Sequence, residues 1–171
     1  MPEAIRWVGI SGSWRVTSAQ VEQDVRSTVR DIITSGNGIV TGGALNVDYQ
    51  ATDEALALNK ASHIKVYLPS TLEIYTSHYR KRASEGVVAE KQADDLIAQL
   101  TRLRELNPEG LIENPHNTIM NTAKYFERNQ LIVDASDELI AFQVNESKGT
   151  QDTIDKARAK GIPVTVFSYK V

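Results

Sequence analysis

Three short segments rich in glycine, serine and threonine each stand between an apolar run and a stretch with helical spacing. They are Ile10-Ser11-Gly12-Ser13, Thr41-Gly42-Gly43-Ala44 and Glu146-Ser147-Lys148-Gly149-Thr150. A strand-to-helix junction leaves unpaired backbone N–H groups at the positive end of a helix, which favours a phosphate or another anion. Three such junctions in one chain therefore predict a single pocket for a phosphorylated small molecule.

Apolar runs and helical segments alternate along most of the chain. We expect strands near residues 4–10, 38–41, 64–68, 138–142 and 163–167. The segments between them have helical spacing, as in Val21, Val25 and Val29, where Thr17 and Gln20 have the spacing of a capping box. This alternation predicts an α/β fold with three layers, a Rossmann-like domain with a mostly parallel five-stranded sheet.

The length of 171 residues fits one domain, and we predict a single domain over residues 1–171. Strict alternation fails between the third and fourth strands, where Ala93, Leu96 and Leu100 mark an additional helix that Pro108 ends. We interpret residues 86–117 as a helical insertion and not as a second domain.

The composition excludes several classes of protein. A net charge of −3 argues against a surface built broadly for nucleic acid, so a nucleic-acid partner is disfavoured. The chain contains no cysteine, and His63, His78 and His116 lack the spacing of metal ligands, so we expect no metal site. No signal peptide and no apolar run of roughly 20 residues is present, which predicts a cytoplasmic protein without a membrane partner.

The expected topology places the three junctions near one another. In open parallel sheets, ligands bind beyond the carboxyl ends of strands, where the winding direction reverses. If the first strand is central, the first and third junctions face each other across that crevice and the second lies one strand away. Arg15, in the first loop, is suited to bidentate pairing with a phosphate. Neither a P-loop nor a G-x-G-x-x-G fingerprint is present.

Two sets of residues resemble the paired motifs of a known superfamily. The first set resembles the signature G-G-A-x-G-x-D-x-x-A-x-x-x-A-L and consists of Thr41-Gly42-Gly43-Ala44, Val47-Asp48, Ala51-Thr52 and Ala55-Leu56, with Asn46 where the signature has glycine. The second set consists of Arg128-Asn129 before a strand, then Ser147, Gly149-Thr150, Thr153 and Ala157. Together they resemble the SLOG superfamily, which includes the DprA, YspA and YpsA-like proteins and, more distantly, the LOG phosphoribohydrolases.

The resemblance implies a nucleotide-binding domain that acts as a sensor or regulatory module, with AMP, ADP-ribose or a similar nucleotide as ligand. It also implies a homodimer, because members of this superfamily commonly pair. The candidate ligand-binding residues are Ser11, Gly12, Ser13, Arg15, Thr41, Gly42, Gly43, Ala44, Asp48, Arg128, Asn129, Ser147, Gly149, Thr150 and Thr153. Asp48 is ambiguous among them, since a carboxylate stabilises a helix start but repels phosphate.

Two alternatives remain open. The first is a nucleotide N-glycosidase, but LOG-type enzymes carry P-G-G-x-G-T-x-x-E, and here Thr153 stands at the glutamate position without a preceding P-G-G. No catalytic residue is therefore predicted. The second is single-stranded DNA binding of the DprA kind, for which Trp14 is a candidate to stack on a base. The cluster His78-Tyr79-Arg80-Lys81-Arg82 is expected to be a solvated helix face.

Overall fold

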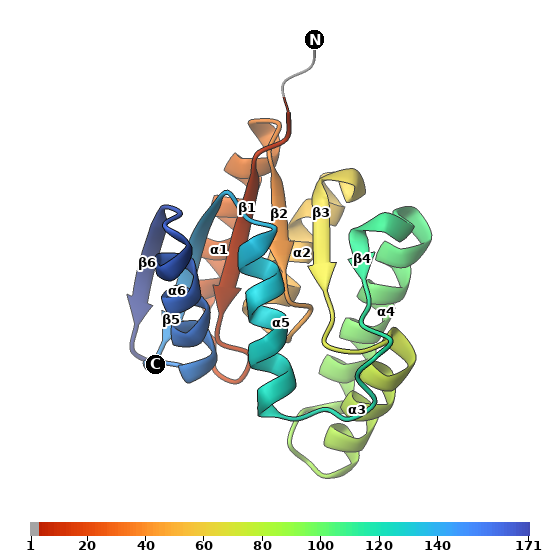
Figure 1. The fold of residues 1–171 in the computed structure, drawn as a ribbon. Coiled ribbons are helices and arrows are strands. Elements are labelled where there is room, and N and C mark those ends of the chain that lie inside the picture. Colours follow the sequence, from red (N-terminus) through yellow and green to blue (C-terminus); the bar gives the residue numbers. More distant parts are fainter. Residues whose placement is uncertain (1–3) are drawn as a thin grey trace.

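The computed structural model describes residues 4–171 and contains one parallel sheet with helices on both faces (Figure 1). Its strands are β1 (Trp7–Gly12), β2 (Gly38–Thr41), β3 (Ile64–Tyr67), β4 (Leu111–Ile112), β5 (Glu138–Val144) and β6 (Val164–Tyr169). They are arranged in the order β4-β3-β2-β1-β5-β6, and every neighbouring pair is parallel. The Rossmann-like α/β architecture and the central first strand are therefore confirmed.

The helices form the two outer layers. They are α1 (Ala19–Thr34), α2 (Val47–Ala57), α3 (Leu72–Ser84), α4 (Glu90–Leu106), α5 (Thr122–Asp134) and α6 (Lys148–Lys160), with short 3-10 turns η1 (Ala61–His63) and η2 (Pro108–Gly110). Figure 1 shows α5 and α6 in front of the sheet, with α1, α2 and α4 behind it. Helix α3 lies beyond the carboxyl ends of β3 and β4, at the bottom of the view. In residues 4–171, no helix is both long and apolar enough to cross a bilayer.

The prediction of five strands is wrong by one. Strand β4 lies within residues 86–117 and pairs with β3 through the Cα partners Val66–Leu111 and Tyr67–Ile112. The amide of Leu68 also donates to the carbonyl of Ile112 at 2.9 Å. A two-residue strand is too short to show any period-two pattern, so periodicity could not reveal it. Residues 86–117 thus carry α4 and also add an edge strand to the sheet.

The apolar stripe predicted for the first helix is confirmed. Val21, Val25 and Val29 on α1 are fully buried against the sheet. The helix begins one residue later than the capping-box spacing suggests, because the side chain of Ser18, and not of Thr17, accepts the amide of Val21. On the opposite face, a second apolar cluster of Val133, Leu139, Ala141, Ile154 and Ala157 packs α5 and α6 against β5.

Close backbone packing at β1 explains one glycine of the first junction. A Cβ atom at Gly12 would lie 2.5 Å from a methyl group of Val47, the first residue of α2. Val47 is itself fully buried, so it has no space to move into. Gly12 therefore allows the start of α2 to pack directly on the end of β1.

We predict that Gly12→Ala lowers the free energy of unfolding by about 1–3 kcal/mol, because overpacking forces side chains and backbone to shift. Gly149→Ala is the matched control, since a Cβ at Gly149 meets nothing within 4 Å. In the first turn of α6, alanine should be neutral or stabilising by up to about 1 kcal/mol. Urea denaturation of both variants measures the difference, and equal stabilities would contradict this account of Gly12.

Candidate anion-binding edge

The three glycine-rich junctions follow β1, β2 and β5, which are neighbours in the sheet. Since these strands are parallel, their carboxyl ends lie at one edge, the lower edge in Figure 1. Gly12 at the end of β1 is the Cα partner of Phe142 on β5. The winding direction reverses between β1 and β5, which is where ligands bind in sheets of this kind. The structure thus places all three junctions at this switch-point edge.

Helices that begin at this edge differ in how their first turns are capped. Side chains cap α1, α3 and α5, where Ser18, Thr71 and Asn121 accept the amides of Val21, Ile74 and Lys124. The N-cap residues of α2 and α6 are Asn46 and Ser147, and neither makes a side-chain cap hydrogen bond. Among the described helices that directly follow a strand, the two without a side-chain cap are those after β2 and β5, on either side of β1.

The start of α2 is covered by the chain itself. Asn46 has a φ of 60°, in the left-handed region, which accounts for glycine at this position in the superfamily signature. Its side-chain amide donates to the carbonyl of Trp14 at 2.6 Å, which ties the first loop to the second. Leu45 and Val47 on either side are buried. This helix start is therefore enclosed by protein atoms.

The start of α6 is open. Ser147 and Thr150 bond to each other through their hydroxyl groups at 3.2 Å. Within residues 4–171, the backbone amides of Lys148, Gly149 and Thr150 have no hydrogen-bond acceptor. Lys148 and Gly149 are exposed, and the space around Gly149 is free. These amides, at the positive end of a helix of 13 residues, can receive an anion.

At the second junction, the chain's own side chains occupy the groups that the sequence offers to a ligand. The Asp48 carboxylate accepts the amides of Gly42 and Ala44, each at 3.2 Å. The hydroxyl of Thr41 pairs with that of Thr52 at 3.3 Å. Gly43 has a φ of 68°, and a Cβ there would meet Leu68 at 2.7 Å. In residues 4–171, this junction is thus an internally bonded loop.

Arg128 and Asn129 connect the second junction to the third. Arg128 is buried, with 6% of its surface exposed, and its Nη1 donates to the carbonyls of Gly42 and Tyr67. Its Nε donates to Oδ1 of Asn129 at 3.3 Å. The Asn129 amide nitrogen donates to Asp152 at 3.0 Å and to the carbonyl of Gly149 at 3.5 Å. We call this chain of contacts the Arg128–Asn129 bridge.

Burial dominates the electrostatics around the bridge. Desolvation raises the pKa of Asp48, and the charge of Arg128 and the amides of Ala44 and Gly42 partly offset this rise. Three tyrosines nearby, Tyr75, Tyr79 and Tyr125, also have a pKa raised by burial. Their phenols therefore stay protonated at neutral pH and act as donors, as when Tyr75 donates to the carbonyl of Gly43 at 2.9 Å.

The first and third junctions contain the remaining candidates. Ser11 is buried at the end of β1, and the hydroxyl of Ser13 accepts the amide of Val16 at 3.2 Å. Arg15 is exposed, and its guanidinium carbon lies 4.7 Å from the centre of the Trp14 ring. The hydroxyl of Thr153 donates to the carbonyl of Gly149 at 3.2 Å, so this buried side chain supports the backbone of the third junction.

The predicted residues therefore fall into two groups. One group is held inside the protein: Ser11, Ser13, Thr41, Gly42, Gly43, Ala44, Asp48, Arg128, Asn129, Thr150 and Thr153. The other reaches solvent at least in part through Gly12, Arg15, Ser147 and Gly149. The sequence analysis missed the roles of Tyr75 and Asp152, since nothing in their local patterns shows that they bond to distant loops.

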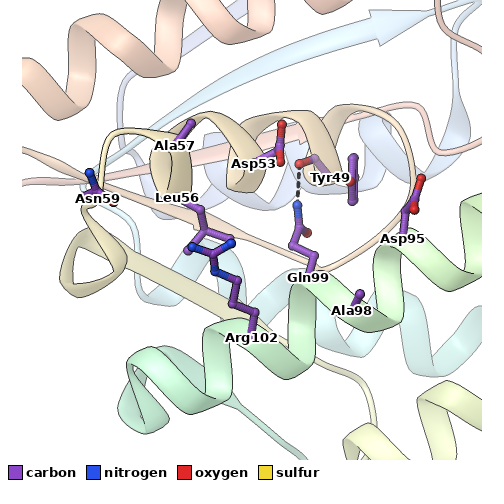
Figure 2. Close-up of a pocket in the computed structure, with 9 residues that line it drawn as sticks. All are labelled: Tyr49, Asp53, Leu56, Ala57, Asn59, Asp95, Ala98, Gln99 and Arg102. Atoms are coloured by element: carbon purple, nitrogen blue, oxygen red, sulfur yellow. Dashed lines mark hydrogen bonds between the residues drawn. The ribbon is translucent and has the colours of Figure 1, made fainter.

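A groove of about 460 Å³ lies away from this edge, between α2 and α4 (Figure 2). Part of its polar lining has partners: the Gln99 amide nitrogen donates to the carbonyl of Tyr49 at 2.9 Å, and Asp53 and Asp95 pair with Arg26 and Lys91. The buried Oε1 of Gln99 accepts no hydrogen bond from residues 4–171. In the described part of the chain, no cluster of three acidic or histidine side chains could hold a metal ion.

Residues 2–171 match the model of the family described as DNA recombination-mediator protein A. The chain belongs to this family. The match covers almost all of the sequence and agrees with the expected SLOG superfamily. Among proteins with curated descriptions, the search found no match.

Solved structures of family members have the same fold. DNA processing protein A from Helicobacter pylori, described for its single-stranded DNA binding mode, superposes with a TM-score of 0.68 at 21% identity and covers 94% of this chain. DNA processing protein A from Streptococcus pneumoniae gives 0.63 at 18% identity and 95% coverage. The present chain spans only 64% and 50% of those two proteins.

The solved structure of a cofactor carrier protein is also similar to this chain. The molybdenum cofactor carrier protein from Chlamydomonas reinhardtii has a TM-score of 0.53 at 15% identity, over 94% of this chain and 76% of the carrier. At identities this low, the three comparisons establish the shared fold.

We predict that Arg128→Met destabilises the protein by about 3–5 kcal/mol, because it leaves the buried Asp48 carboxylate without its compensating charge. The double variant Asp48→Asn/Arg128→Met should lose less than the sum of the two single changes. Urea denaturation of the four proteins in the cycle measures this coupling. Additive losses would contradict an interaction between the two side chains.

The same variant should show a characteristic pH dependence. Without Arg128, the folded-state pKa of Asp48, already raised by burial, rises further. A folded pKa above the unfolded one adds stability at low pH that is lost as the pH rises through the folded value. Arg128→Met should therefore lose more stability relative to wild type at about pH 8 than at about pH 5. A loss that is independent of pH would show that the carboxylate charge is not responsible.

Proposed function

We propose that this protein binds nucleotide phosphate groups at the switch-point edge. The observation that carries the proposal is the open start of α6, where three amides without a partner in residues 4–171 point from a helix end with space around Gly149. Lys148 adds a positive charge in the same turn, and Arg15 adds another on the loop after the neighbouring strand. Helix dipole, free donors and basic side chains together favour a phosphate.

Single-stranded DNA is the form of ligand that we favour. Membership of the DNA recombination-mediator protein A family supports it, as does the single-stranded DNA binding described for the Helicobacter pylori relative. Arg15, Lys148 and Gly149, which would contact phosphates, are exposed, and this suits a strand lying across the surface. The net charge of −3 means that binding depends on the local charges of Arg15 and Lys148, not on the protein as a whole.

A free nucleotide such as AMP or ADP-ribose is the second candidate. The glycine-rich junctions at the switch point support it, because that edge is where sheets of this type bind mononucleotides. A fold shared with a molybdenum cofactor carrier is consistent with carriage of a small ligand. The sensor role, the homodimer and the cytoplasmic location stay predictions from the sequence. Light scattering after size exclusion would test the dimer.

Gly149→Asp tests the phosphate site without disturbing the fold. A carboxylate in the first turn of α6 is favourable for the helix dipole but repels phosphate, and the position has room for it. We expect the affinity for a fluorescent oligothymidylate of about ten nucleotides to fall at least roughly tenfold. Gly149→Asn, of the same shape without the charge, is the matched control and should bind like wild type.

Fluorescence anisotropy at about 50 and 200 mM salt measures this binding, which should weaken as the salt concentration rises. In parallel, AMP and ADP-ribose at millimolar concentration are tested for a rise in melting temperature, since binding to the folded state stabilises it. Stabilisation by a nucleotide without oligonucleotide binding would favour the second candidate. Equal binding by Gly149→Asp and wild type would refute the α6 site.

A further inference from the structure

Trp14 is a large apolar side chain held at the switch-point edge with no apparent role in the core. Its exposed fraction is 38%, and it belongs to neither of the two buried apolar clusters. It follows β1 by two residues, directly between Ser13 and Arg15. An exposed tryptophan at this position requires an explanation other than packing.

Two contacts involve Trp14, one at its backbone and one at its ring. The Asn46 side chain donates to its backbone carbonyl at 2.6 Å, which fastens the tip of the first loop to the start of α2. The guanidinium of Arg15 lies 4.7 Å from the ring centre, a cation–π contact that restrains the ring. A ring held in advance loses little conformational freedom when a partner stacks on it.

We propose that Trp14 is a stacking platform for an unpaired nucleobase of the bound nucleotide or strand. This inference rests on the proposed function and adds a base-binding position to it. An indole ring offers a flat apolar surface, and every nucleobase has a face that can stack on it. Arg15 next to it provides a charge for the adjoining phosphate, so one loop supplies both kinds of contact.

The topology places this platform beside the phosphate site. Trp14 extends from the end of β1 and Lys148 from the end of β5, and these two strands are adjacent. Neighbouring strands lie about 5 Å apart, so the two loops leave the sheet side by side at the same edge. A base in a duplex is already stacked and paired, so a platform of this kind selects single-stranded or mononucleotide ligands.

The experiment compares an oligothymidylate with an abasic oligonucleotide of the same length, which has phosphates but no bases. We expect wild type to bind the oligothymidylate roughly tenfold more tightly than the abasic strand, the effect of stacking one base. Trp14→Ala should lose this preference and bind both strands as weakly as wild type binds the abasic one. Trp14→Phe should keep most of the preference, because it retains an aromatic face.

Tryptophan fluorescence gives a second readout. The chain has two tryptophans, so Trp7→Phe leaves Trp14 as the only one, and its melting temperature shows whether the fold is kept. The oligothymidylate should quench Trp14 emission and the abasic strand should not. Binding of both strands with equal affinity, or a base preference that survives Trp14→Ala, would overturn this inference while leaving the phosphate site standing. Failure of wild type to bind either strand, together with no rise in melting temperature on addition of AMP or ADP-ribose, would overturn both.

Discussion

The buried guanidinium of Arg128 is the interaction on which the arrangement of the switch-point edge depends. It comes from α5 and reaches the carbonyl of Gly42 on the loop after β2, while Asn129 next to it reaches the loop after β5. The backbone hydrogen bonds of a parallel sheet end where its strands end, so the loops beyond them need separate support. A charged side chain is costly to bury, and here the opposite charge of Asp48 and the carbonyl acceptors offset that cost.

This support has an uneven effect on the three junctions. In the loop after β2, the Asp48 carboxylate accepts the amide of Gly42, while Arg128 and Tyr75 donate to the loop's carbonyls. The loop after β5 accepts hydrogen bonds at the carbonyl of Gly149, from Asn129 and Thr153, and at that of Ser147, from Gln143. Within residues 4–171, the N–H groups of Lys148, Gly149 and Thr150 stay free. Three segments with similar sequences thus have different roles. The loop after β2 is held by bonds within the protein, the end of β1 packs Gly12 against Val47, and the loop after β5 is open to a ligand.

Much of the fold could be predicted from the sequence, because strand and helix periodicity and the glycine-rich boundaries are local signals. The central place of β1 followed from general rules of topology. Strand β4 escaped because two residues cannot show a period. The internal bonding of the second junction could not be predicted either. Asp48 lies four residues beyond Ala44, and only the folded backbone shows that the Asp48 carboxylate turns back to accept the amide of Ala44. Arg128 is a comparable case, because the carbonyls to which it donates lie more than 60 residues away in the chain.

The loop after β2 is closed by bonds within the protein, whereas the start of α6 is open, so the two regions differ in how freely their sequences can change. Substitutions in the loop after β2, or of its partners Asp48 and Arg128, disturb buried charges and lower the stability of the fold. This region is therefore constrained whatever ligand the protein binds. Substitutions at Lys148 or Gly149 meet only solvent and leave the frame intact. Descendants of this architecture can therefore exchange one anionic ligand for another by changing a few exposed positions, without rebuilding the domain that carries them.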